Sequence, residues 1–168
     1  MIEEYKSHIA SISKELGCRV DMRPDIPGMM YVESGYIETP TIKNQIHYLT
    51  ALHECGHYAW GHTQGRPPHQ DKRFYFDNGV LRSEAQAWEF ALDRCLDELQ
   101  DNSRRFMWDT CLGSYYFDSI LHGNSPHRLW NGNRHHVEFI YDKPDAYFTS
   151  IVKRIQGNTK DFKIKYNG

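Results

Sequence analysis

The sequence predicts an α+β fold in which a small antiparallel sheet packs against a mostly helical domain. Three short strand-like runs stand close together near the N-terminus, and most of the remaining chain places apolar residues at helical spacing. This order, a short sheet followed mainly by helices, is typical of an α+β domain. With 168 residues, the chain is long enough to bury a core without disulfides. We therefore expect one domain, with its core in residues 1–100 and a helical extension in residues 101–168.

The N-terminal part is expected to form one helix and the small sheet. Residues 3–16 repeat apolar side chains at helical spacing, and Gly17 is a suitable end for that helix. A strand over residues 18–24 follows. Two further strands flank Ser34 and Gly35, which favours a hairpin. These two strands cover residues 29–34 and 36–40.

The middle of the chain is expected to contain two helices joined by a long connection. The first helix spans about residues 41–62, before one glycine and two prolines that break it. Residues 63–80 then form a connection longer than most inside a compact domain. The second helix begins near Ser83, because Ser-Glu-Ala-Gln has the form of a capping box. Its apolar stripe runs from Trp88 to Leu99.

The C-terminal part is expected to be helical apart from one stretch. Helical patterns recur over residues 103–113 and 114–123, and a glycine closes each of them. Residues 127–143 fit a loop and a strand. A last helix runs from Pro144, a favoured residue type at a helix start, to Gln156.

Composition narrows the classes of function. The formal net charge of −2 gives no overall case for binding to nucleic acid or to an anionic membrane. The N-terminus lacks the apolar core of a signal peptide, and no run approaches the ~18 apolar residues of a membrane helix. The four cysteines form no CxxC pair and are expected to be reduced thiols. These features favour a cytoplasmic protein and leave its oligomeric state open.

The stretch ALHECGHYAWGH, residues 51–62, contains the motif HExxH. On a helix, His53 and His57 project from one face, so their imidazoles can bind one metal ion. Glu54 is adjacent to a ligand and can take a proton from a water on that ion, as a general base does. Two imidazoles with one carboxylate suit zinc well. The motif therefore predicts a zinc-dependent hydrolase, and it requires a third protein ligand.

Glu84 is the strongest candidate for the third ligand. It follows His57 by 27 residues and heads an apolar stripe, so its carboxylate needs a partner if it is buried. Its alternative role is to stabilise the helix dipole in the first turn. His62 is a rival ligand, but it projects about 140° away from His57 around the helix. His47 fits a surface or packing role better than a ligand role.

Gly56 stands inside the motif helix. Glycine in a helix interior costs about 1 kcal/mol relative to alanine. That cost is explained if another backbone or a substrate comes close to the helix at this residue. We therefore expect a close approach there.

The motif HECGH, together with EAQAWEFAL at residues 84–92, resembles the ImmA/IrrE-type zinc metallopeptidases. The resemblance implies a zincin-like metallopeptidase core in which Glu54 is the general base. It further implies a protein substrate of the regulatory kind, such as a DNA-binding transcriptional repressor. By the same resemblance, the zinc ligands are His53, His57 and Glu84.

The resemblance extends over about residues 1–100 and includes departures from the family pattern. Cys55 stands where the family usually has a bulkier apolar residue. Glutamate-ligand zincins of the thermolysin kind place an aspartate four residues after the third ligand, and here that position is Trp88. Residues 101–168 have no counterpart, so substrate selection would fall to them or to the connection at 63–80.

Two other functions are compatible with the sequence. In one, zinc braces a non-catalytic protein-interaction module, although such a site does not need Glu54. In the other, the C-terminal region binds single-stranded nucleic acid through basic and aromatic side chains that three aspartates interrupt. The residues of this second reading are Arg104, Arg105, Phe106, Trp108, His127, Arg128 and Trp130.

Hydrolysis of a peptide also needs a donor for the developing oxyanion. Six residues are candidates, and each also fits a surface or packing role. They are His122, His127, His135, His136, Tyr115 and Tyr116. The sequence selects none of them.

Overall fold

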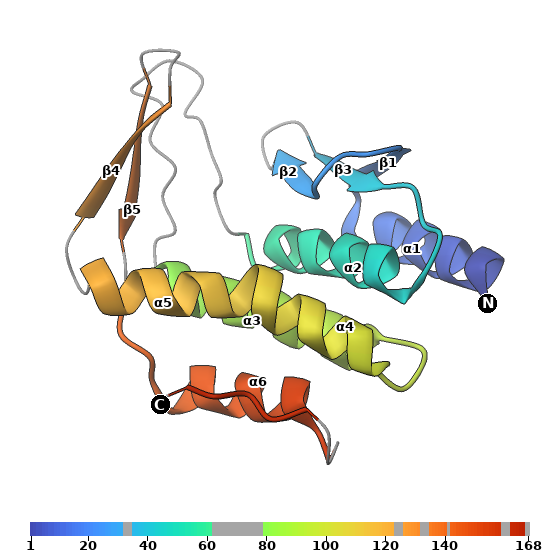
Figure 1. Ribbon diagram of the computed structural model, residues 1–168. Helices are drawn as coiled ribbons and strands as arrows, with labels where there is room; N and C mark the ends of the chain where they lie inside the picture. Colours follow the sequence, from blue (N-terminus) through green and yellow to red (C-terminus); the bar gives the residue numbers. More distant parts are fainter. Residues whose placement is uncertain are drawn as a thin grey trace.

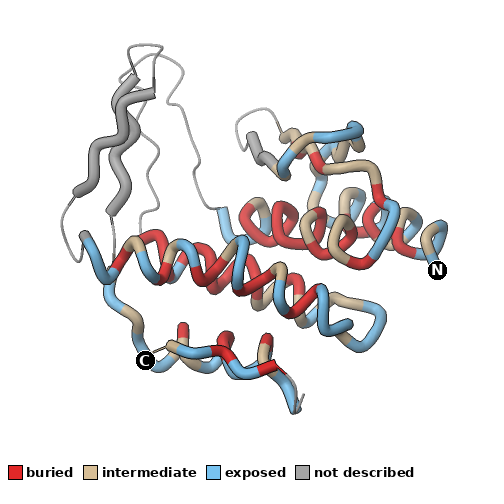
Figure 2. Tube along the Cα trace, in the orientation of Figure 1, coloured by how far each residue is buried: buried red, intermediate tan, exposed pale blue. Residues whose placement is uncertain are grey.

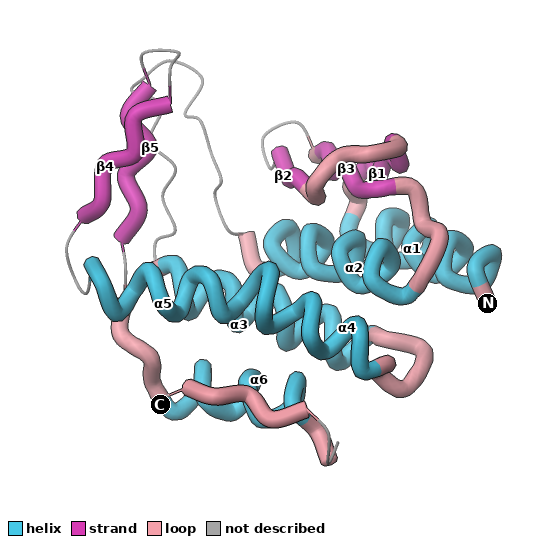
Figure 3. Tube along the Cα trace, viewed as in Figure 1, coloured by secondary structure: helices cyan, strands magenta, loops and turns pink. Residues whose placement is uncertain are grey.

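The computed structural model describes residues 1–31, 35–61, 79–122, 126–131, 135–140, 142–158 and 162–166. Of these, residues 29–31, 122, 126–131 and 135–140 are described by their backbone alone. The predicted α+β fold, mostly helical with a small sheet, is confirmed (Figures 1 and 3).

The N-terminal helix α1 (Ile2–Leu16) forms as predicted. Its apolar stripe is buried through Tyr5, Ile9 and Ile12. Gly17 ends the helix in the left-handed conformation, with φ 67°, and its N–H bonds to a carbonyl of the last turn. Here local spacing and a glycine stop decide the structure.

The sheet contains β1 (Arg19–Arg23), β2 (Met29–Tyr31) and β3 (Tyr36–Pro40), in the order β1-β3-β2. The hairpin of β2 and β3 is antiparallel, as predicted. The prediction of an antiparallel sheet is wrong for the other pair, because β1 runs parallel to β3. The chain reverses direction twice between these two strands, so β3 points the same way as β1. Because β3 is the central strand, it lies next to β1, and the two strands pair in parallel.

Helix α2 (Gln45–Ala59) carries the HExxH motif. It begins four residues later than predicted because Asn44 caps it: the Asn44 side chain accepts a hydrogen bond from the N–H of His47. Residues 62–78 lie outside the described part of the chain. That range includes His62 and nearly all of the predicted connection.

Helix α3 (Val80–Arg94) begins one turn before Ser83. The predicted start at a capping box is therefore wrong. Ser83 is buried inside the helix instead. The start of α3 is capped from a distance of about 60 residues in sequence: the Asp142 carboxylate accepts hydrogen bonds from the N–H groups of Leu81, at 2.7 Å, and Arg82, at 2.9 Å. The helix also ends before the predicted stripe does, and Leu96 is 45% exposed.

A continuous helical stretch follows, formed by α4 (Asp101–Arg105), the π-helical segment η2 (Phe106–Leu112) and α5 (Gly113–His122). The prediction that a glycine closes the first half is wrong. Gly113 continues the helix, and a Cβ there would lie 2.5 Å from the carbonyl oxygen of Trp108. Glycine at this position therefore permits the wide π turn rather than ending the helix.

The chain ends in a hairpin and a helix. The hairpin consists of β4 (Pro126–Asn131) and β5 (His135–Ile140), which pair antiparallel, where a loop and one strand are predicted. Helix α6 (Ala146–Gln156) starts close to the predicted position. Asp145 caps it by accepting a hydrogen bond from the N–H of Phe148.

Helix α2 lies between the sheet on one side and α3 on the other, and α6 packs against α3 (Figure 1). The buried residues concentrate along α1, α2, α3 and the facing sides of α5 and α6 (Figure 2). The ligand-bearing part of α2 is thus inside the molecule. Among the described residues, no helix has the length and apolar composition needed to cross a bilayer.

Candidate metal site

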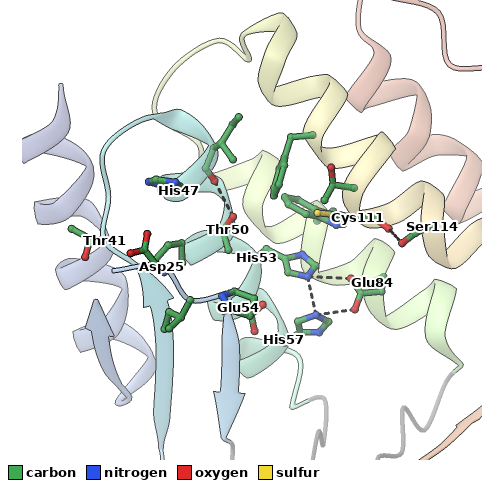
Figure 4. A pocket seen from close by; sticks show the side chains of 18 of the residues that line it. Asp25, Thr41, His47, Thr50, His53, Glu54, His57, Glu84, Cys111 and Ser114 are labelled. Carbon is green, nitrogen blue, oxygen red and sulfur yellow. Dashed lines mark hydrogen bonds and ion pairs between the residues drawn. The ribbon is translucent and has the colours of Figure 1, made fainter. Parts of the chain in front are cut away.

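Two histidines of α2 and one glutamate of α3 converge inside the protein (Figure 4). The Nε2 atoms of His53 and His57 lie 3.0 Å apart. The Glu84 carboxylate places Oε2 3.1 Å from the first of these nitrogens and Oε1 3.2 Å from the second. A tetrahedral zinc ion separates its ligand atoms by about 3.3 Å, so these spacings match those of a zinc site. The three side chains are 7%, 1% and 3% exposed.

Close packing of α2 on α3 brings the three groups together. The four-residue spacing of the histidines puts both rings on the face of α2 that meets α3. Gly56 lies on the same face, and a Cβ there would be 2.6 Å from the Ala87 carbonyl oxygen. The expected close approach at Gly56 is therefore confirmed, and the approaching group is the backbone of α3.

The Glu84 carboxyl is buried, yet its pKa is lowered. Burial by itself raises the pKa of this carboxyl. Electrostatic interactions with His57 and His53, together with the hydrogen bonds from both rings, hold the pKa well below its usual range. A divalent cation among the three groups would favour the ionised carboxylate in the same way.

Glu54 lies against Gly28, which ends the loop between β1 and β2. A Cβ on Gly28 would lie 2.7 Å from Cγ of Glu54 and 2.8 Å from its Oε1, so a glycine allows the loop to cover this side chain. Burial raises the pKa of Glu54 to about 7; the electrostatic interaction with His57 opposes the rise, and the charge of Glu84 adds to it. Its Oε2 atom is buried without a hydrogen-bond partner in the described part of the chain.

The site opens into a cavity of about 530 Å³, a volume typical of ligand pockets. One wall is formed by the loop between β1 and β2 and by the first half of α2. The opposite wall is formed by η2 and the start of α5. The titratable side chains Asp25, Lys43 and His47 also line the cavity. Figure 4 shows Asp25 and His47 on the side away from Glu84. Much of the remaining lining is apolar or hydroxylic, through Ile26, Pro27, Thr50, Trp88, Phe106, Thr110 and Ser114.

Cys111, from η2, also lines the cavity. Burial raises the pKa of its thiol to about 12, and the negative charges of Glu84 and Glu54 add to the rise. All four cysteines are free thiols, as expected from their spacing. In the absence of a metal ion, Cys111 is therefore an uncharged part of the cavity wall.

The structure separates the other candidate ligands and donors. His47 lines the cavity but is not part of the converging group, and its Nδ1 faces the N–H of Lys43 at 3.3 Å. Tyr115 lines the cavity, whereas Tyr116 is buried in the core against Phe148. The remaining oxyanion candidates lie outside the described side chains; these are His122, His127, His135 and His136.

The basic and aromatic patch considered for nucleic acid is not fully on the surface. Arg104 is 7% exposed, and its guanidinium donates to the carbonyl oxygens of Arg154 and Ile155 at the end of α6. This side chain therefore stabilises a helix terminus. The side chains of the patch that belong to β4 are not described.

Two features of the site escape sequence reasoning. Trp88 packs its ring against His53, with ring centroids 4.1 Å apart, and Gly28 covers the general-base candidate. The position of Trp88, one turn after Glu84 on a helix, is a usable signal for the first feature. The turn that contains Gly28 shows nothing that links it to α2.

Comparison with protein-family models, with curated proteins and with solved structures finds no match for this chain. The geometry of the site is therefore the basis for assigning a function. That geometry is a buried group of two imidazoles and one carboxylate that could hold a metal ion, consistent with a zincin-type HExxH site.

Proposed function

We propose that this chain is a zinc-dependent metallopeptidase that hydrolyses a peptide bond in a protein substrate. One observation carries the proposal: the ligand atoms of His53, His57 and Glu84 all lie within 4.8 Å of one another, at the wall of a cavity. Neither the motif nor the resemblance at residues 84–92 requires this convergence by itself. Their agreement with the geometry is what supports a metal centre.

The donor set fits zinc. Two imidazole nitrogens and one carboxylate are the protein ligands of many catalytic zinc sites, which keep a further position for water or substrate. Two deprotonated imidazoles with nitrogens 3.0 Å apart repel each other unless a proton or a cation lies between them. A zinc ion held by His53, His57 and Glu84 would supply a Lewis acid that acidifies water and polarises a carbonyl group.

Glu54 is the residue that moves the proton in the proposed reaction. It follows a ligand directly in the sequence, it is 7% exposed, and Oε2 has no partner among the described residues. The carboxylate takes a proton from the attacking water and then donates it to the leaving amine. A site whose metal only braces the fold has no use for a buried carboxylate of this kind.

The cavity suits a peptide segment. Its volume accommodates several side chains, and most of its lining residues are uncharged. The resemblance to ImmA/IrrE-type metallopeptidases points to a regulatory protein, such as a transcriptional repressor, as the substrate. We place this activity in the cytoplasm, in line with the reduced cysteines.

Metal content tests the site first. We expect one zinc per chain in the wild type purified without chelators, and a sharp loss in Glu84→Ala, measured by atomic emission. Glu98→Ala, at an exposed position in the loop after α3, is the matched control and should keep the metal. Absence of zinc from the wild type, even after zinc is supplied, would overturn the proposal.

Hydrolysis tests the reaction. Zinc-loaded wild type should cleave an unfolded protein such as casein, and Glu54→Gln should retain zinc but lose at least about 100-fold in rate. Full zinc occupancy with equal, negligible cleavage by both proteins would favour the non-catalytic zinc-braced module instead.

A further inference from the structure

The ring of Trp88 lies against the ring of His53. The two ring centroids are 4.1 Å apart and the planes are inclined by 31°. Trp88 is 1% exposed, and it also borders the cavity. Because Trp88 follows Glu84 by one turn of α3, one helix presents both the carboxylate that meets His53 and the flat surface that supports it.

Within the described part of the chain, no hydrogen bond holds the outer nitrogen of His53. Nε2 faces Glu84 and His57, whereas Nδ1 is buried without a partner among the described residues (Figure 4). Most metal-binding histidines donate a hydrogen bond from the N–H of that second nitrogen to a carboxylate or carbonyl oxygen, which fixes the orientation of the ring. In this chain the position where thermolysin-type zincins have an aspartate is occupied by Trp88.

The indole acts through its surface. Its Nε1 atom is also buried without a hydrogen-bond partner in the described part of the chain. No described residue uses the N–H group of Trp88, and what the indole offers His53 is a flat aromatic face. An aromatic ring without the N–H group should serve nearly as well.

We propose that Trp88 is a positioning residue, whose ring packs against His53 and keeps Nε2 directed at the metal site, in place of the usual hydrogen bond donated by Nδ1–H. The inference rests on the zinc site of the proposed function and goes beyond it by naming what orients a ligand. It predicts that metal affinity depends on an aromatic ring at this position.

Zinc affinity, measured by competition with a chromophoric chelator, tests the proposal in four proteins. Trp88→Leu should bind zinc at least about 10-fold more weakly than the wild type, while Trp88→Phe stays within about threefold. Trp108→Leu is the control for loss of a buried tryptophan, because Trp108 is 5% exposed and packs against Tyr116 and Tyr166 outside the cavity lining. It should also stay within about threefold of the wild type.

The visible absorption of the cobalt-substituted proteins is the second measurement, and it reports on ligand geometry directly. The spectrum should be unchanged in Trp88→Phe and altered in Trp88→Leu, or in Trp88→Met if the leucine variant does not fold. Zinc binding by Trp88→Leu equal to that of the wild type would overturn the proposal. So would an equal loss in Trp88→Phe, or in Trp108→Leu. A wild type that binds no zinc would remove the proposed function and this inference together.

Discussion

Gly56 of α2 packs directly on the backbone of Ala87 in α3. A Cβ on Gly56 would lie 2.6 Å from the Ala87 carbonyl oxygen and 2.9 Å from its Cα, distances that side chains do not tolerate. This contact sets the separation of the two helices. It therefore decides whether Glu84, one turn earlier on α3, reaches both histidines of α2.

Gly56→Ala is expected to weaken both folding and zinc binding. Overpacking at a backbone contact costs about 1–3 kcal/mol, which exceeds the gain of about 1 kcal/mol from better helix propensity. We expect a lower urea midpoint for the metal-free protein and weaker zinc binding, because α3 must move away from α2. A variant more stable than the wild type would show that the two helices have room between them.

Glu54→Gln is expected to stabilise the metal-free protein at pH 8 and to change little at pH 5. Burial raises the pKa of Glu54 from 4.5 to about 7, so the folded state holds a proton that the unfolded state has released. The wild type keeps its full stability below the unfolded pKa and loses some as the pH rises through 7. Glutamine carries no such cost, and the gain at pH 8 should be about 3 kcal/mol.

Urea unfolding at the two pH values, in the presence of a chelator, measures this difference. Glu98→Gln, on the exposed loop after α3, should leave stability unchanged at both. Equal effects of Glu54→Gln at pH 5 and pH 8 would contradict the predicted cause, because a packing effect does not depend on the charge of the carboxyl.

Asp142→Ala is expected to destabilise the fold by about 1–2 kcal/mol, because it removes the cap of α3. Two N–H groups lose their acceptor, and Gly79, with φ 89° at the start of the helix, provides no side chain to replace it. Asp142→Asn should cost less, because the amide keeps one acceptor. Thermal unfolding measures both variants. Asp101→Ala, on an exposed residue of α4 that caps nothing, is the control, and an equal loss there would argue against the capping role.

Zinc is expected to raise the thermal midpoint. Free zinc at 100 times its dissociation constant stabilises the folded chain by about 2.7 kcal/mol. For a domain of this size that corresponds to about 5–10 °C. Differential scanning calorimetry with zinc or with a chelator measures the shift. Glu84→Ala should show almost none, and an equal shift in that variant would place the stabilising zinc elsewhere.

The features that follow from local spacing could be predicted from the sequence. Helix α1 depends on apolar residues one turn apart and on Gly17, and both act within a few residues. The two histidines share a face because they are four residues apart on a helix, whatever surrounds that helix. Glu84 is predicted as the third ligand because a buried carboxylate needs a partner. The structure places its carboxylate against both histidines.

The start of α3 and the direction of β1 depend on contacts between residues far apart in the chain, so only the tertiary structure decided them. The start of α3 is set by Asp142, about 60 residues away, so the local resemblance of Ser83 to a cap had no effect. The direction of β1 relative to β3 depends on which strand occupies the centre of the sheet.

The surroundings of the Glu54 and His53 side chains were likewise decided by packing. Glu54 is covered because Gly28 allows a loop to approach, and His53 is supported because α3 brings Trp88 against it. The sequence by itself determined the chemistry of the candidate site, since residue types and helical spacing are local properties. Only the tertiary structure decided which groups enclose and orient the site. Those contacts join segments that are far apart in the sequence, and no local pattern predicts them.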